Sequence, residues 1–280
     1  MSSAASLQIP PSRTAGVVRR VIDVIDAVAQ PALIDVENVP ASGPFLMVGN
    51  HQLLGMQDLP ALVRELERHC GVRVRGMADR FHFALPGWRE LLVRMGAVPG
   101  TRENCRRLLA QGEPVLVFPG GAREVYKRRH QEYQLVWGER TGFARLAIEA
   151  GCPIVPLAAV GAEDRFRVVL DMDSRIAGPA RSLMRRIGHR DDVGTLLLVG
   201  SGPVGLPGTG RLYFRFGEPI ATTRWADRAD DPEALAECRD LVKAAVESGI
   251  ANLLAARADD PKRGLWARAR GRLPARTVLP

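Results

Sequence analysis

Short, continuous apolar runs alternate with helical patterns through much of this 280-residue chain, and this alternation limits most strongly what it can fold into. The runs are residues 45–48, 114–118 and 153–161. Continuous apolar runs are typical of strands buried on both faces, as in a largely parallel sheet. Residues 59–70 and 142–150 have helical spacing, and each is followed by a glycine that can end a helix. The sequence therefore predicts an α/β fold with a mixed, largely parallel central sheet flanked by helices.

Weaker patterns extend this alternation. They predict strands over residues 72–76, 196–199 and 211–216, and helices over residues 17–29, 89–95, 103–110 and 232–256. The polar side of the 17–29 helix mixes acidic and basic residues, which favours packing on the domain over lying in a membrane surface. We predict a flexible N-terminus over residues 1–15, a single α/β domain over residues 16–258 and a basic C-terminal tail over residues 259–280.

Composition narrows the class of protein. With 46% hydrophobic and 25% charged residues, the chain has the balance of a soluble globular protein. Its 4 cysteines are scattered, which suits a reducing compartment and argues against a disulfide framework or a zinc site. We find no signal-peptide pattern and no apolar stretch of the roughly 18 residues that a membrane-spanning helix needs. We therefore predict a cytoplasmic protein that is peripheral on the inner face of the cell membrane.

The formal net charge of +8 predicts acidic partners. Anionic lipid, a phosphorylated cofactor and nucleic acid are all compatible with charge alone. Nucleic acid is disfavoured because the basic residues lack an interleaved aromatic platform or a recognised motif. Two basic segments, residues 127–129 and 179–190, suit phosphates or an anionic membrane surface, and a solvated surface accounts for them as well.

His51 is the residue most clearly marked for chemistry, because it follows the run at residues 45–48 and so lies on a loop at a strand end. Such loops are where α/β folds place functional side chains. An imidazole, with an unperturbed pKa of about 6.5, suits a general base at neutral pH. Asp58, at the predicted start of a helix, has two interpretations: a helix N-cap, or the carboxylate that orients His51. By itself, a lone histidine is more often structural.

Two further strand-end loops strengthen the case for His51. Residues 96–102 and 118–123 both combine glycines, which let a backbone approach a ligand closely, with an arginine that can hold an oxyanion or a phosphate. These arginines are Arg102 and Arg123. Three such loops can converge on one site in this fold class.

In order and spacing, these segments resemble the sequence blocks of the glycerophospholipid (lysophospholipid) acyltransferase superfamily. The matching segments are His51 with Asp58, residues 96–102, residues 118–123 (Phe-Pro-Gly-Gly-Ala-Arg, similar to the family's Phe-Pro-Glu-Gly-Thr-Arg) and residues 154–157. The resemblance spans about residues 44–161, and residues 211–220 resemble a late strand of the family. Four matches in order are far more specific than one.

The resemblance implies transfer of an acyl chain from a thioester, acyl-CoA or acyl carrier protein, to a lipid alcohol. In such an enzyme, His51 takes the proton from the acceptor hydroxyl and Asp58 orients the imidazole, as in a serine-hydrolase triad whose alcohol comes from the substrate. Arg102 and Arg123 would bind substrate. The resemblance implies no bound cofactor, no metal ion and no covalent acyl-enzyme. It leaves the oligomeric state open.

Gly120 and Gly121 are implied in substrate binding, and their backbone N–H groups are candidates for stabilising the developing oxyanion. Gly120 stands where the phospholipid-making members of the family carry glutamate. Phe-Pro-Gly-Gly followed by Arg123 and Glu124 resembles the diacylglycerol-acyltransferase-like branch, which implies a neutral alcohol as acceptor.

The spacing between His51 and Asp58 departs from the family pattern. Residues 52–57 lie between them, whereas the family usually has four intervening residues. Seven positions of a regular helix rise about 10.5 Å, too far for a direct hydrogen bond. Pairing therefore requires the loop to fold back at Gly55; otherwise Asp58 is only an N-cap. A non-catalytic lipid-binding or scaffold protein on the same fold, or hydrolysis with water as acceptor, are the alternatives.

Overall fold

The computed structural model describes residues 30–52, 58–84, 88–128, 130–171, 195–201, 208–270 and 278–279. The predicted helix over residues 17–29, the basic segment at residues 179–190 and Gly55 lie outside these ranges.

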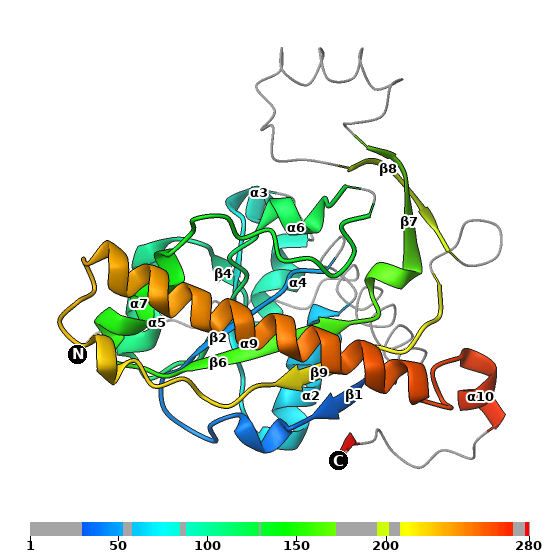
Figure 1. The fold of residues 1–280 in the computed structure, drawn as a ribbon, viewed down its shortest axis with the longest axis horizontal. Helices are drawn as coiled ribbons and strands as arrows, with labels where there is room; N and C mark the ends of the chain where they lie inside the picture. The colour runs from blue at the N-terminus through cyan, green and yellow to red at the C-terminus, as the bar shows by residue number, and fades with distance from the viewer. Residues whose placement is uncertain are drawn as a thin grey trace.

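An eight-stranded sheet, in the order β10-β1-β9-β6-β2-β5-β3-β4, is the centre of the described structure (Figure 1). Its strands are β1 (Ala32–Ile34), β2 (Leu46–Gly49), β3 (Arg75–Ala78), β4 (Val98–Pro99), β5 (Val115–Val117), β6 (Ile154–Val160), β9 (Tyr213–Phe216) and β10 (Val278–Leu279). Strand β2 pairs in parallel with β5 and β6, and the parallel arrangement continues from β5 through β3 to β4. Strands β6 and β9 are antiparallel. The predicted mixed, largely parallel sheet is confirmed.

Helices cover both faces of this sheet. They are α2 (Leu59–Cys70), α3 (Arg80–Ala84), α4 (Trp88–Arg94), α5 (Arg102–Ala110), α6 (Ala122–Val125), α7 (Gly142–Ala150), α9 (Pro232–Asp259) and α10 (Leu265–Arg270), with 3₁₀ helices η1 (Val36–Asn38), η2 (Glu163–Arg165) and η5 (Thr223–Trp225). Along β2, Leu46 and Val48 pack towards α5, α7 and α9, whereas Met47 packs towards α2. Figure 1 shows α9 lying across its face of the sheet. Because successive strand residues face opposite sides, a continuous apolar run supplies both cores.

Several predicted boundaries agree with the structure. Helix α2 ends at Gly71 and helix α7 at Gly151, and both glycines adopt the left-handed conformation, at φ 66° and φ 60°. Strand β3 starts later than the predicted strand at residues 72–76. Val72 and Val74 are buried beside α2 in the segment that leads to β3. The alternation of apolar and polar residues there therefore reflects burial and not strand pairing.

Strands β7 (Phe166–Asp171) and β8 (Thr195–Gly200) form a separate antiparallel ribbon that leaves the body of the molecule after β6 and η2 (Figure 1). Strand β8 agrees with the prediction for residues 196–199, while β7 was not predicted. The ribbon therefore begins at the carboxyl end of β6.

The predicted basic tail contains ordered elements. Helix α9 ends at Asp259, next to the predicted boundary; α10 follows, and β10 pairs in parallel with β1. Asp260 is buried and accepts hydrogen bonds from Arg211 Nη1 (3.0 Å) and Tyr213 Oη (2.7 Å). These contacts join the start of the tail to the sheet. Within the described ranges, no helix has the length and apolar character needed to span a membrane.

Candidate active site

The three predicted loops lie at one edge of the sheet. Because β2, β5 and β4 run in the same direction, their carboxyl ends meet at this edge and carry His51, residues 118–123 and Arg102 respectively. Strands β5 and β3 separate β2 from β4, so Arg102 lies roughly 14 Å along the edge from the His51 strand, at about 4.8 Å for each strand spacing. Arg102 is exposed at the start of α5. The structure thus brings the β2 and β5 loops together and leaves Arg102 at the periphery.

His51 is held by two residues of the segment that follows β5. Its ring stacks on Phe118 with a centroid distance of 4.3 Å and an interplanar angle of 24°. Its backbone N–H donates to Glu124 Oε2 at 2.7 Å. Both contacts come from the segment that follows β5, because β5 is the strand beside β2.

The residues on either side of His51 are anchored to the end of β6. Asn50 donates from Nδ2 to the Ala159 carbonyl and accepts the Ala159 N–H at Oδ1, both at 2.8 Å. Gln52 accepts the Ala162 N–H at Oε1, also at 2.8 Å. Asn50 and Gln52 are fully buried. The residues before and after the histidine are therefore fixed to the end of β6 and to the turn that follows it.

The predicted pairing of Asp58 with His51 is not formed. Asp58 Oδ2 instead accepts a hydrogen bond from Gln52 Nε2 at 3.1 Å. His51 Nδ1 and Asp58 Oδ1 are buried without a hydrogen-bond partner among the described residues. The physical reason is that Asp58 is committed to the start of α2, where its carbonyl accepts the Leu62 N–H at 2.8 Å, and Gln52 takes its carboxylate. The N-cap alternative is correct in position, although the Asp58 side chain makes no capping hydrogen bond.

Glu124 is the carboxylate at this site that sequence reasoning missed. It is fully buried, and its Oε1 accepts the Val136 N–H at 2.9 Å while Oε2 accepts from His51. Burial raises the pKa of Glu124 to about 6, against the opposing effect of Lys127 and the two N–H donors. A signal was present, since Glu124 directly follows the block that ends at Arg123, but spacing alone gave it no partner.

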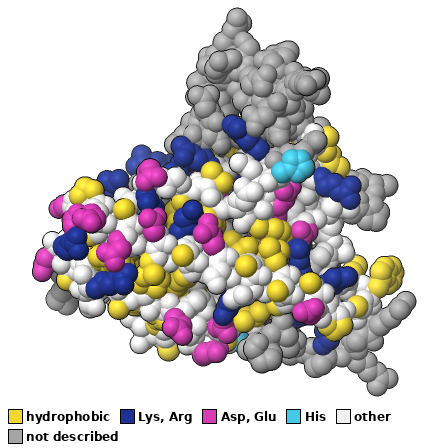
Figure 2. Space-filling model, in the orientation of Figure 1, with side chains coloured by type: hydrophobic (Ala, Val, Ile, Leu, Met, Phe, Trp, Pro, Cys, Tyr) yellow, Lys and Arg dark blue, Asp and Glu magenta, His cyan; other side chains and the backbone are white. Residues whose placement is uncertain are grey.

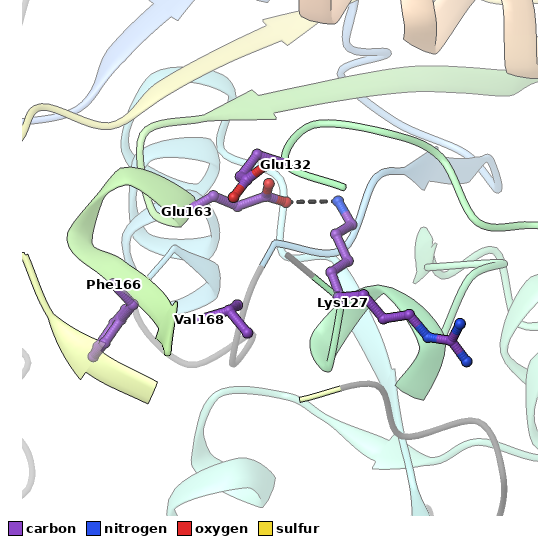
Figure 3. Close-up of a pocket in the computed structure, with 6 residues that line it drawn as sticks. Lys127, Glu132, Glu163, Phe166 and Val168 are labelled. Atoms are coloured by element: carbon purple, nitrogen blue, oxygen red, sulfur yellow. Dashed lines mark hydrogen bonds and ion pairs between the residues drawn. The ribbon is translucent and has the colours of Figure 1, made fainter. Parts of the chain in front are cut away.

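The electrostatic surroundings keep the His51 imidazole neutral. Burial, together with the smaller effects of the positive charges of Lys127 and His82, lowers the pKa of His51 to about 3. Lys127 is itself buried and bonded through Nζ to Glu163 Oε1 at 2.6 Å. Figure 3 shows Lys127 and Glu163 facing each other in a small pocket, with Phe166 and Val168 of the ribbon on its wall. A neutral imidazole is the form that can accept a proton.

The glycine turn after β5 is held from outside by Arg140, a second residue that was not predicted. Arg140 Nη1 donates to the Pro119 carbonyl at 2.8 Å and to the Gly120 carbonyl at 2.7 Å. Gly121, at φ 53°, donates its N–H to the Phe118 carbonyl at 3.1 Å. That N–H is engaged within the turn, and the roles of Gly120, Gly121 and the half-buried Arg123 in substrate binding stay predictions.

In the part of the chain that the structure describes, no group of three or more histidine, cysteine, aspartate or glutamate side chains is arranged to hold a metal ion.

Comparison with known proteins identifies the segment that carries this geometry. Residues 32–160, which include His51, Asp58, Glu124 and Arg140, match the family described as Acyltransferase. This segment belongs to the acyltransferase family. The predicted resemblance is confirmed, and the acyltransferase segment contains both His51 and the turn that holds it.

Relatives match over more of the chain. Phytyl ester synthase 1, chloroplastic, from Arabidopsis thaliana is 34% identical over 247 residues, which cover 82% of this chain and 35% of that protein. The protein named DGAT1/2-independent enzyme synthesizing storage lipids, from Bos taurus, is 35% identical over 131 residues, 47% of this chain and 39% of the relative. The chain thus spans little more than a third of the length of these two relatives.

A solved structure is similar in fold. The 1-acyl-sn-glycerophosphate (LPA) acyltransferase PlsC from Thermotoga maritima superposes with a TM-score of 0.51 at 16% identity, covering 89% of this chain and 86% of the other. At this identity the likeness supports the fold alone.

Proposed function

We propose that this chain is an O-acyltransferase that moves an acyl chain from a thioester donor to a lipid alcohol, with His51 as general base. The observation that carries the proposal is the position of His51 within the acyltransferase segment. Its imidazole lies at the carboxyl edge of parallel strands, is kept neutral, and has a buried Nδ1 with no partner among the described residues. An unengaged neutral imidazole at such an edge is suited to accept a proton.

In the proposed reaction, the imidazole takes the proton as the acceptor oxygen attacks the thioester carbonyl carbon. The new C–O bond forms, the C–S bond breaks, and the leaving thiolate takes the proton from the imidazolium. The proton goes to the thiolate because a thiolate is a much stronger base than the His51 imidazole, whose pKa is lowered to about 3. No covalent acyl-enzyme is required.

The surroundings of His51 favour a neutral acceptor. Two cations of the site are already engaged, Lys127 with Glu163 and Arg140 with two backbone carbonyls. Gly120 also replaces the glutamate of the phospholipid-making members. The names of the relatives, a phytyl ester synthase and a storage-lipid enzyme, point to the same acceptor class. We therefore favour a neutral alcohol over a lysophospholipid phosphate, with acyl-CoA or acyl carrier protein as donor.

Peripheral contact with an anionic membrane surface is part of the proposal. The ribbon and α10 lie on the side of the molecule towards which β6 runs (Figure 1). Their sequences include the exposed apolar residues Val169, Val199 and Trp266. Helix α10 is tied to that side, because Arg268 donates to the Thr209 carbonyl and the adjacent Gly208 donates its N–H to the Arg165 carbonyl of η2. On the α9 face, acidic and basic side chains are intermixed (Figure 2), which makes that face a poor match for anionic lipid.

Location in the cell stays a prediction. We retain the proposal of a cytoplasmic protein at the inner face of the cell membrane, noting that the name of the Arabidopsis relative places that relative in the chloroplast.

A non-catalytic lipid-binding protein is the second candidate. The unpaired geometry of His51 and Asp58 favours it, because a relay built on those two residues is not formed. It predicts liposome binding without consumption of any thioester.

Thiol release from acyl-CoA by the purified chain, measured against a panel of neutral and phosphorylated lipid alcohols, tests the proposal. We expect His51→Ala to lower acceptor-dependent kcat by about 1,000-fold, within the range for loss of a general base. His69→Ala is the matched control, because His69 lies on α2 and contacts Glu65, with Nε2 3.3 Å from Oε2. Equal turnover by His51→Ala and wild type would refute the assignment of the base.

A further inference from the structure

Glu124 makes two hydrogen bonds that join separate parts of the site. Its carboxylate receives the backbone N–H of His51 at 2.7 Å and that of Val136 at 2.9 Å, one on each oxygen. The side chain is fully buried, so water does not compete for either bond. Hydrogen bonds to an ionised acceptor are stronger than neutral ones. Glu124 thus links the β2 loop to the segment before α7.

Gly120 provides the space that this carboxylate occupies. A Cβ atom at position 120 would lie 2.2 Å from Glu124 Cδ and 2.5 Å from Oε2, well inside contact distance. The turn cannot easily move away, because Arg140 holds the carbonyls of Pro119 and Gly120. The absence of a side chain at position 120 and the placement of Glu124 are therefore one structural feature.

We infer that Glu124 is the positioning residue of His51, and that glycine at position 120 is what admits its carboxylate. Asn50 and Gln52 anchor the chain on either side of the histidine, and Glu124 fixes the His51 peptide unit itself. With that unit fixed, the imidazole stays stacked on Phe118 at the strand end. The role in turnover rests on the proposed function, whereas the contact does not.

Gly120 and Glu124 together suggest a structural role for the glycine-rich block at residues 118–123. Where the phospholipid-making members of the family carry glutamate, this chain has Gly120, and a carboxylate four residues later faces the backbone of His51. This carboxylate lies just after the block and serves to orient the histidine.

A double-mutant cycle on the full chain tests the inference, with Glu124→Gln, Gly120→Ala and the double variant. A glutamine amide can accept only one of the two N–H groups, and an alanine methyl displaces the carboxylate. Each single variant is expected to lower kcat by roughly 30-fold with KM within about twofold, since small misplacement of a catalytic group costs up to about 100-fold. The double variant should be no slower than the slower single variant. The control is Asp260→Asn, which changes a buried carboxylate whose hydrogen-bond partners are Arg211 and Tyr213.

The His51 backbone amide gives a readout that needs no substrate. In wild type, its proton resonance should lie downfield because of the short bond to a carboxylate, and it should move upfield in both single variants but not in Asp260→Asn. An unchanged resonance in Glu124→Gln, or kcat effects that multiply in the double variant, would overturn the inference. If the shift occurs while wild type consumes no thioester, the contact holds and the proposed function fails.

Discussion

Two buried carboxylates flank His51, and they are used differently. Asp58, on the α2 side, accepts from the Gln52 side chain and keeps one oxygen without a partner among the described residues. Glu124, on the β5 side, has both oxygens satisfied by backbone N–H groups, one of them from His51. The α2 side thus secures the loop, whereas the β5 side contacts the histidine. The comparison teaches that adjacency of strands, not nearness along the chain, selects the partner of a loop residue.

The same difference is visible in the elements that carry the two carboxylates. Asp58 begins a twelve-residue helix whose direction is set by packing of Leu62 and Leu66 on the sheet. Glu124 lies on the four-residue helix α6, directly after the strand beside β2. Because α6 follows β5 at the carboxyl edge of the sheet, Glu124 reaches the loop that leaves the neighbouring β2.

The largest expected effect separates the two carboxylates by activity. Glu124→Gln should lower kcat by roughly 30-fold, whereas Asp58→Asn should lower it by less than about threefold, because Asp58 bonds the Gln52 side chain and not His51 itself. Burial raises the pKa of Asp58, so the neutral amide removes a desolvation cost. Steady-state kinetics with one neutral alcohol acceptor measures both. Equal losses in the two variants would abolish the distinction between the two sides.

The next effect concerns stability on the α2 side. Gln52→Ala removes hydrogen bonds to Asp58 and to the Ala162 N–H, both buried. The free energy of unfolding should fall by about 2 to 3 kcal/mol, because two buried polar groups lose their partner. Urea denaturation followed by circular dichroism measures it. The control is Gln134→Ala, an exposed residue whose change should stay within about 0.5 kcal/mol. A Gln52 effect as small as the control would mean that this anchor is dispensable.

A third expected effect is the pH dependence that His51 contributes to stability. Its pKa in the folded chain, about 3, lies below the unfolded value of 6.5, so the unfolded chain takes up the proton first as the pH falls. Stability is therefore lost between pH 6.5 and pH 3. From pH 7 to pH 5, wild type should lose up to about 2 kcal/mol more than His51→Gln.

Comparing wild type with His51→Gln separates the contribution of His51 to the pH dependence of stability from that of Glu124. The pKa of Glu124 is raised, so its contribution to stability has the opposite sign and is lost as the pH rises through about 6. Glu124 is present in both proteins and largely cancels. Identical pH profiles in urea denaturation would show that the His51 surroundings do not disfavour the charged ring.

The smallest expected effect lies at the far end of the edge. Arg102 is exposed and separated from β2 by two strands. Arg102→Ala should raise the KM for acyl-CoA by about threefold with kcat unchanged, as expected when uniform binding is lost. Initial rates over a range of donor concentrations measure it, and a fall in kcat comparable to that of Glu124→Gln would place Arg102 in the reacting centre. Arg107→Ala, an exposed change on the same helix, is the control.

The sequence by itself determined the scaffold and the position of the histidine. Continuous apolar runs and the glycines after them predict β2, β6, α2 and α7 at or close to their observed bounds, because burial and left-handed helix ends depend on local residue types. The order of the loops then places His51 and residues 118–123 at one edge. The family resemblance follows from the same local blocks.

Only the tertiary structure decided what His51 contacts. Its bond to Glu124 joins residues 73 positions apart, and no spacing rule links a loop after β2 to a short helix after β5. The lowered pKa likewise depends on burial and on Lys127, neither of which is visible along the chain. The family resemblance pointed to Asp58 in spite of its spacing, but hydrogen bonds form between groups that packing brings together, and packing brought Gln52 to Asp58 and Glu124 to His51.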